Sequence, residues 1–225
     1  MLNNLFEEQG FAERLDATAD KIMSELLAQY DQKNLAYGNN AHQGFLRYGP
    51  ISYVIRIEDK LNRLETLWEN PDAADGGERI EDTLGDAITY CFMFIGSLVE
   101  TCYSAEWFDN QDATRQCFKR NAIAKGGFSK EFSHVIRDYD DRELMDFSYD
   151  ESMVIRAMRL MKNCPPEKYS EPVFALAYRL CFLMALLRMG HPRAKDLCDT
   201  FFVRPKGYKN RFDYWTQNGR DKEEA

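Results

Sequence analysis

The 225-residue chain lacks a long uninterrupted hydrophobic run, and it lacks an excess of positive charge. Its most apolar runs are "AITYCFMFIGSLV", which is too short to cross a bilayer, and "VFALAYRLCFLMALL", which Arg179 interrupts. The polar N-terminal "MLNNLFEEQG" is unlike a secretory signal. A net charge of −8 argues against broad binding to DNA or RNA, because phosphate contacts need clustered Lys and Arg. We therefore expect a cytoplasmic protein that binds no membrane and forms no stable nucleic-acid complex.

Histidine and paired cysteine are also scarce. The three histidines, His42, His134 and His191, lie far apart in the sequence, which argues against a His-rich zinc site. The six cysteines contain no C-x-x-C pair, and four of them lie in apolar stretches of helical character. We therefore expect buried free thiols in a reducing compartment.

The chain has no internal repeat and no strand-like alternation of useful length, but it has clear helical periodicity. An apolar stripe at spacings of three or four predicts a helix within residues 5–32. Gly, Asn and Pro predict a loop over residues 34–50. Further helices are predicted at 50–69, over about twenty residues from near Glu78 with acids in the first turns, at 150–163 and at 171–190. The fold class is therefore all-α, as a helical bundle.

The helix predicted over residues 50–69 carries a compact charged patch. On a helical wheel, four charged side chains fall within about 100° of one another: Arg56, Asp59, Lys60 and Arg63. A different side of the wheel is apolar and consists of Ile51, Val54, Leu61, Leu64 and Trp68. Glu58 and Glu65 lie at the edge of this apolar side, where acids are either paired within the bundle or bound to a ligand.

The next predicted helix carries a row of acids. Glu78, Asp82 and Asp86 follow one another at a spacing of four, and Tyr90 continues the row. Beyond Asp86 the helix is apolar nearly all round, so we expect the row to face a protein layer. Buried carboxylates need a counter-charge, which Mg²⁺ or Mn²⁺ could supply together with Lys and Arg on the facing helix. The alternative is a solvent-exposed row with ordinary salt bridges between neighbouring turns.

Together, these two motifs resemble a known family. The pattern R-x-x-D-K-x-x-R-L-x-x-L at residues 56–67 is followed by I-E-D-T-L-x-D-x-x-x-Y at residues 80–90. The pair is similar to the nucleotide-modification-associated domain of phages and bacteria. That domain resembles the all-α nucleoside triphosphate pyrophosphatases, the superfamily of MazG and the dimeric dUTPases. The resemblance covers roughly residues 20–100.

The resemblance implies a four-helix-type nucleotide-binding core over residues 1–100 and an additional helical segment over residues 101–225. It implies hydrolysis of a (d)NTP to the monophosphate and pyrophosphate with Mg²⁺ or Mn²⁺, in nucleotide-pool control or DNA-base modification. A homodimer or higher homo-oligomer in the cytosol of a bacterium or of a phage-infected host is also implied.

The resemblance also assigns roles to individual residues. The catalytic candidates are Asp59, Asp82 and Asp86. The metal-ligand candidates are Asp82 and Asp86 on the second helix, Glu58 or Asp59 on the first, and Glu81, for which the alternative is that it simply faces the helix N-terminus. The phosphate-binding candidates are Arg56, Lys60 and Arg63. Tyr37, Asn40 and Tyr90 would line the nucleotide, although "YGNN" also has the composition of a plain turn.

The C-terminal "KGYKNRFDYWTQNGRD" is similar to the stretch of dimeric dUTPases that closes over the nucleotide. It would add Lys206 and Lys209 to the phosphate-binding candidates and Trp215 to the nucleotide-binding ones. The alternative is a flexible polar tail.

Two departures from the superfamily pattern keep other functions open. The first-helix E-x-x-E is missing, since Leu61 stands three residues after Glu58, and Thr83 occupies a position where Glu is expected. A non-catalytic nucleotide-binding or regulatory module and a helical interaction protein therefore remain alternatives.

Overall fold

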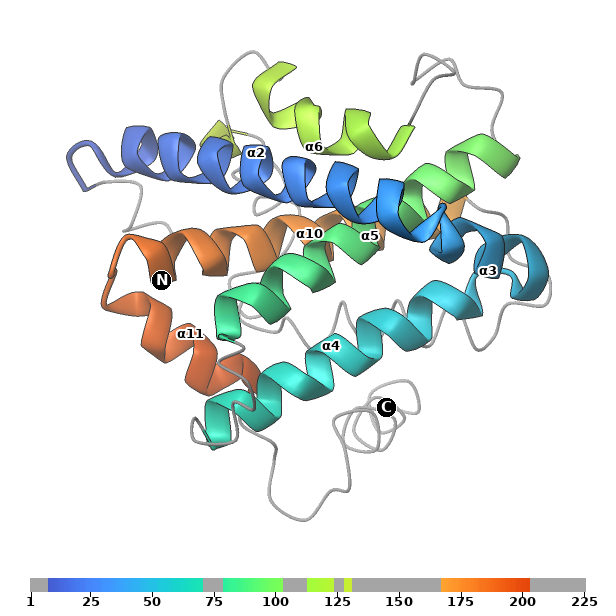
Figure 1. Ribbon diagram of the computed structural model, residues 1–225. Helices are drawn as coiled ribbons and strands as arrows, with labels where there is room; N and C mark the ends of the chain where they lie inside the picture. Colours follow the sequence, from blue (N-terminus) through green and yellow to red (C-terminus); the bar gives the residue numbers. More distant parts are fainter. Residues whose placement is uncertain (1–7, 71–78, 103–112, 124–127, 131–166, 203–225) are drawn as a thin grey trace, which may run out of the picture.

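The computed structural model describes residues 8–70, 79–102, 113–123, 128–130 and 167–202, and these ranges are helical without any strand (Figure 1). The all-α prediction is therefore confirmed. The helices are α2 (Phe11–Tyr37), α3 (Asn40–Tyr48), α4 (Ile51–Glu69), α5 (Ile80–Cys102), α6 (Ala113–Ile123), α10 (Glu167–Arg188) and α11 (Arg193–Phe202). No helix in these ranges is both long and apolar enough to cross a membrane.

Helix α5 lies at the centre of the bundle. It packs against α4, α10 and α6, and also contacts α2 and α3 (Figure 1). This position agrees with its sequence, because a helix that is apolar nearly all round must be covered on most sides. The helix predicted to start near Glu78 is thus confirmed from Ile80 onward.

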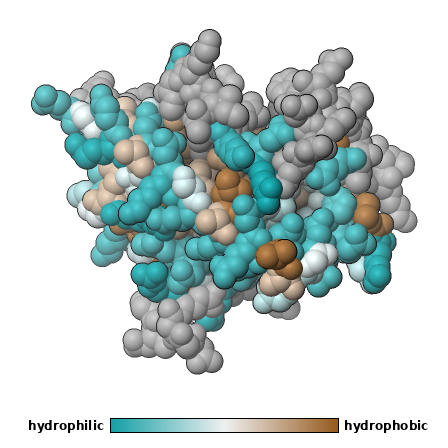
Figure 2. All heavy atoms as spheres, turned by 45° about the horizontal axis from the view of Figure 1, so that its top comes forward, coloured by the Kyte–Doolittle hydropathy of each residue, from teal (hydrophilic) through white to brown (hydrophobic). Residues whose placement is uncertain are grey.

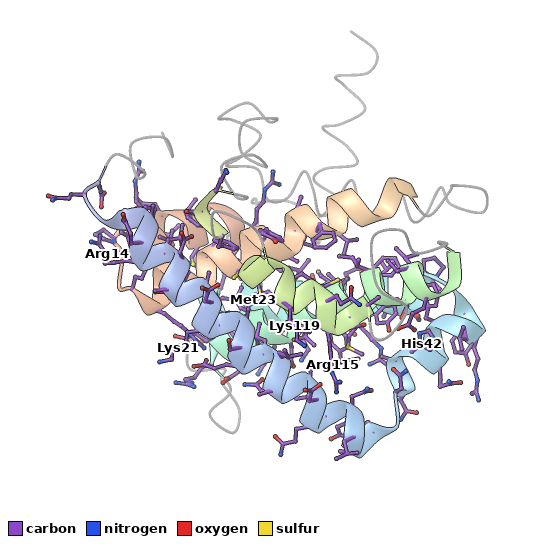
Figure 3. All side chains as sticks on the ribbon, turned by 90° about the horizontal axis from the view of Figure 1, so that it is seen from above. Arg14, Lys21, Met23, His42, Arg115 and Lys119 are labelled. Carbon is purple, nitrogen blue, oxygen red and sulfur yellow. The ribbon has the colours of Figure 1, made fainter. Side chains whose placement is uncertain are left out.

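The apolar stripe predicted within residues 5–32 forms the buried side of α2. Phe11, Leu15, Ile22, Leu26 and Tyr30 are all buried. Burying a side chain of this size stabilises the fold by roughly 1.5–3 kcal/mol. Helix α6 lies alongside α2, and the guanidinium Nε of Arg115 on α6 contacts Asp31 Oδ1 on α2 at 2.8 Å (Figure 3).

The predicted loop over residues 34–50 is wrong for most of its length. Helix α2 continues to Tyr37, only Gly38 and Asn39 form the turn, and α3 begins at Asn40. Both turn residues adopt the left-handed conformation, with φ of 60° and 58°, which Gly and Asn tolerate best. Helix α3 is stabilised by Phe45, whose buried ring packs against Tyr53 and Phe94.

The C-terminal half of the chain completes the core that the N-terminal half begins. Buried residues from α2 to α11 form one hydrophobic cluster, to which α10 contributes a nearly continuous run from Val173 to Leu186. The helix predicted at 171–190 is α10, whereas α6 and α11 were not predicted. The helix predicted at 150–163 lies outside the described residues.

Helix α11 connects the end of α10 to the end of α4. The indole Nε1 of Trp68 donates a hydrogen bond to Asp199 Oδ1 at 2.9 Å, and its ring lies against that of Phe202. Trp68 therefore faces the protein, as the helical wheel of α4 predicted.

Among the residues that the structure describes, four cysteines are free and buried, namely Cys91, Cys117, Cys181 and Cys198. Burial raises the pKa of Cys198 to about 12 and also raises the pKa of Cys91 and Cys181. The expectation of buried free thiols is confirmed for these four residues.

Large apolar side chains are exposed where α2 ends and α4 begins. They are Leu35, Tyr37, Leu46, Tyr48, Ile51 and Ile55. Ile51 was predicted on the apolar side of α4, but it stands at the first position of that helix, beyond the reach of the core. The face shown in Figure 2 is mainly hydrophilic and carries a few small hydrophobic areas.

Candidate functional site

The two charged motifs of the sequence meet across the interface between α4 and α5. The ammonium of Lys60 on α4 lies 2.9 Å from Asp86 Oδ2 on α5. One turn away on each helix, the guanidinium of Arg56 lies over the ring of Tyr90, 5.6 Å from its centroid. The earlier residue of α4 pairs with the later residue of α5, so the helices run antiparallel (Figure 1). The spacing of four in each motif produces these two adjacent contacts.

A third helix contributes a residue that the sequence did not identify. The ammonium of Lys33 on α2 donates a hydrogen bond to Asp86 Oδ1 at 2.8 Å. Each carboxylate oxygen of Asp86 thus accepts from a different lysine. We refer to Lys33, Asp86 and Lys60 as the Lys–Asp–Lys cluster. No local pattern marks Lys33, because its role depends on α2 lying near α5.

The environment of Asp86 favours its charged form. Burial alone would raise the pKa of this carboxyl, but the hydrogen bonds and positive charges of Lys33 and Lys60 outweigh burial and hold the pKa below its usual value. A lowered pKa in the folded state means that the ionised carboxylate stabilises the fold at neutral pH.

The acid dependence of stability should reveal this contribution. The stability supplied by ionised Asp86 is fully present above the unfolded-state pKa of about 4 and is lost as the pH falls through the lower folded-state pKa. At pH 7, wild type should exceed Asp86→Asn by about 1 kcal/mol in unfolding free energy. Urea unfolding at pH 7, 4 and 3 should show this difference shrinking. Asp59→Asn, at an exposed carboxylate of α4, is the control; a difference for Asp86→Asn that does not change with pH would contradict the assignment.

Asp82 occupies a different environment from Asp86. Its side chain is 51% exposed, and Oδ2 accepts a hydrogen bond from the backbone N–H of Arg79 at 3.0 Å. The expectation that the whole acid row faces a protein layer is therefore wrong for Asp82. The physical reason is its position in the first turn of α5, where backbone N–H groups need acceptors. Glu78 lies outside the described residues.

Glu81 takes part in a pair of salt bridges that connects three helices. Its Oε2 accepts from Arg188 Nε on α10 at 3.1 Å, while Arg188 Nη1 donates to Glu25 Oε2 on α2 at 2.7 Å. Asp86 stands five positions after Glu81, which places the two residues about 140° apart around the helix. Glu81 thus has a partner on a different side of α5 from the Lys–Asp–Lys cluster.

The remaining charged candidates lie along α4. Glu58, Lys60 and Arg63 are partly buried, whereas Arg56 and Asp59 are exposed. Glu65, which was predicted to be either paired or bound to a ligand, is buried at the end of the same helix.

The carboxylates of the described residues do not form a ready-made metal site. In the ranges that the structure covers, no group of three or more His, Cys, Asp and Glu side chains is close enough to hold an ion. Three candidate ligands have other partners: Asp86 binds two lysines, Asp82 binds the start of its own helix, and Glu81 binds Arg188. As they are placed among the described residues, these three carboxylates therefore do not converge on a common position for Mg²⁺ or Mn²⁺.

The nucleotide-binding candidates differ in their surroundings. Tyr37 lies one turn after Lys33 on the same side of α2, and its ring is exposed. Asn40 is exposed at the start of α3, and Tyr90 is partly buried next to Arg56. Three further candidates, Lys206, Lys209 and Trp215, lie outside the described residues.

A second polar cluster lies toward the other end of the α4–α5 interface. The Nδ1 atom of His42 (labelled in Figure 3) lies 2.9 Å from Ser97 Oγ and 3.7 Å from Glu100 Oε2. These residue types occur in hydrolytic triads, but there the acid and the serine use different ring nitrogens. Ser97 is also only 3% exposed and contacts the Tyr53 hydroxyl at 3.0 Å. Burial raises the pKa of Tyr53 to about 12. This cluster is therefore a polar network around the buried Ser97 rather than a catalytic triad.

The fold and the site define an all-α protein in which two lysines from different helices converge on a partly buried aspartate. Comparisons with protein-family models, with curated proteins and with solved structures gave no match to this chain.

Proposed function

We propose that this protein binds a nucleoside triphosphate at the Lys–Asp–Lys cluster and hydrolyses it to the monophosphate and pyrophosphate. The observation that supports the proposal most directly is the 2.9 Å contact between Lys60 and Asp86. This contact brings together the two motifs on which the resemblance to all-α nucleoside triphosphate pyrophosphatases depends.

The charges around the cluster suit a phosphorylated ligand. Two ammonium groups share one carboxylate, so the cluster carries a local positive charge within a protein of net charge −8. Arg56 and Arg63 lie four residues before and three residues after Lys60, and therefore near it on α4. Short charge-assisted hydrogen bonds from such groups are a strong way to hold phosphate oxygens.

Magnesium enters this proposal as part of the substrate. Mg²⁺ in nucleotide sites keeps several waters and binds one or two carboxylates together with the phosphates, without needing an all-protein site. We therefore propose that the ion arrives as Mg·NTP or Mn·NTP. Its contribution would be to polarise the phosphoryl group that water attacks.

A panel of NTPs and dNTPs incubated with Mg²⁺ or Mn²⁺ tests the proposal. We expect chromatography to detect a monophosphate and pyrophosphate from at least one nucleotide, and Lys60→Gln to lower turnover by about a hundredfold. Lys21→Gln, on the exposed surface of α2, is the matched control and should behave as wild type. Absence of product from every nucleotide would reject the hydrolase.

A non-catalytic nucleotide-binding module is the second candidate. It is favoured by the engagement of both Asp86 oxygens with lysines and by the missing E-x-x-E of the sequence. Calorimetric titration with the same nucleotides distinguishes the two candidates, because the module binds a nucleotide without releasing any product.

A further inference from the structure

The Lys–Asp–Lys cluster has the geometry of an anion site that is filled by a side chain of the protein itself. The two ammonium groups approach separate oxygens of one carboxylate, at 2.8 and 2.9 Å. They come from helices α2 and α4, while the carboxylate comes from α5. A phosphate group also presents several oxygens to surrounding donors, and the Lys ammonium group donates hydrogen bonds to carboxylate and phosphate oxygens alike.

We propose that Asp86 is an internal competitor of the phosphate ligand, and that Lys33 and Lys60 exchange its carboxylate for phosphate oxygens when the ligand binds. This inference rests on the proposed function, since it concerns the same site. It assigns Lys33, which lies in neither charged motif, as a phosphate-binding residue.

The exposure of the three side chains permits this exchange. The side chain of Lys33 is 56% exposed, that of Lys60 is 26% exposed, and that of Asp86 is 29% exposed. An anion from solution can therefore approach the cluster without displacing the core. Lys33 is the most exposed of the three residues and lies on α2, so its side chain is the one best able to change partner.

The net charge of the Lys–Asp–Lys cluster differs between variants, and this difference makes the exchange testable. The ionised cluster carries one net positive charge in wild type, two in Asp86→Asn and none in Lys33→Gln. If Asp86 competes with the anion, its neutralisation should strengthen anion binding, because both lysines then lose their contact with an ionised carboxylate. If the anion instead binds away from Lys33 and Lys60, neutralising Asp86 should leave metal-free anion binding nearly unchanged.

The competition also gives the divalent ion a second role. Once phosphates occupy the lysines, the ionised Asp86 carboxylate lies beside further negative charge and repels it. A divalent cation that arrives with the phosphates relieves this repulsion. Asp86→Asn should therefore raise the affinity for the phosphate ligand when no divalent ion is present. When the ion is present, this gain should be smaller or should become a loss.

The test uses inorganic tripolyphosphate as the probe, titrated calorimetrically into the full chain in EDTA at low salt. We expect Asp86→Asn to bind about tenfold tighter than wild type and Lys33→Gln about tenfold weaker. Lys21→Gln, on the same helix and labelled in Figure 3, should bind as wild type does. Adding Lys33→Gln to Asp86→Asn should cancel most of the gain.

Circular dichroism and thermal unfolding establish that each variant is folded before its affinity is compared. Equal or weaker tripolyphosphate binding by folded Asp86→Asn would overturn the inference. Unchanged binding by Lys33→Gln would remove Lys33 from the site. These outcomes are independent of turnover: the inference can hold when no nucleotide is hydrolysed, and it can fail in an active hydrolase.

Discussion

Replacing Gly96 with alanine is expected to lower the free energy of unfolding by about 3 kcal/mol, toward the upper end of the typical cost of overpacking a core. A Cβ at this position of α5 would overlap the Thr114 hydroxyl on α6 and would lie 2.8 Å from Thr114 N and 3.0 Å from Thr114 Cα. Backbone atoms cannot rotate away, so α6 must move from its place against α5. Thermal unfolding should show a midpoint lower by roughly 10 °C for a chain of this size.

Gly85→Ala is a matched control on the same helix. Both substitutions gain about 1 kcal/mol of helix propensity, so the difference between them reports packing alone. The Cβ at Gly85 would lie 2.8 Å from Leu26 Cδ2, which is the tip of a flexible side chain and can shift. We expect Gly85→Ala to stay within about 1 kcal/mol of wild type. Equal losses at the two glycines would show that the close approach of α5 and α6 is not the cause.

Thr114→Ala in the Gly96→Ala background separates the two parts of the clash. It removes the hydroxyl overlap but leaves the backbone nitrogen and Cα of residue 114 in place. Stability should therefore recover only in part, by about 1 kcal/mol. Full recovery would mean that the hydroxyl alone resists the added methyl group.

Asp86→Asn is expected to lower nucleotide hydrolysis by at least about 1,000-fold, a loss typical of removing a central charged group from an active site. After the proposed exchange, the Asp86 carboxylate is the charged oxygen group left beside the bound phosphates. There it can orient the attacking water and balance the positive charge of the divalent ion that arrives with the triphosphate. Asparagine keeps the size of the side chain but loses its negative charge. Pyrophosphate release under saturating Mg·NTP measures the effect.

The control for this loss is Asp196→Asn, at an exposed carboxylate on α11 that lies outside the cluster. It should leave turnover unchanged. Hydrolysis by Asp86→Asn at a near-normal rate would exclude Asp86 from the mechanism. Loss of turnover together with tighter tripolyphosphate binding would separate the catalytic contribution of this carboxylate from its competition with the ligand.

The features that sequence predicted correctly are those with a local signal. The stripe from Phe11 to Tyr30 predicted the buried side of α2, because a spacing of three or four is imposed by a single helix. Lys60 and Asp86 each stand in a motif at helical spacing, which placed them on the facing sides of neighbouring helices; their role in a functional site stays a prediction. Their mutual contact is a finding of the structure, in which α4 and α5 run antiparallel.

The features that sequence missed depend on tertiary contacts. Lys33 and Asp86 are far apart in the chain, and no periodicity connects them. Glu81 stands in an acidic motif, yet its partner Arg188 belongs to a helix more than a hundred residues later. Local composition also misled at residues 34–50, where Gly, Asn and Pro marked only two short turns, at residues 38–39 and 49–50. The burial of Phe45 against α4 and α5 stabilises α3 there.

The four buried thiols provide built-in reporters of local opening. Cys91, Cys117, Cys181 and Cys198 lie on α5, α6, α10 and α11, respectively. Alkylation requires an accessible thiolate, so each buried thiol should react only when its surroundings open. Peptide-resolved labelling rates would thus measure opening free energies helix by helix without engineered probes. Displacement of α6 by Gly96→Ala should accelerate labelling of Cys117 before it affects that of Cys181.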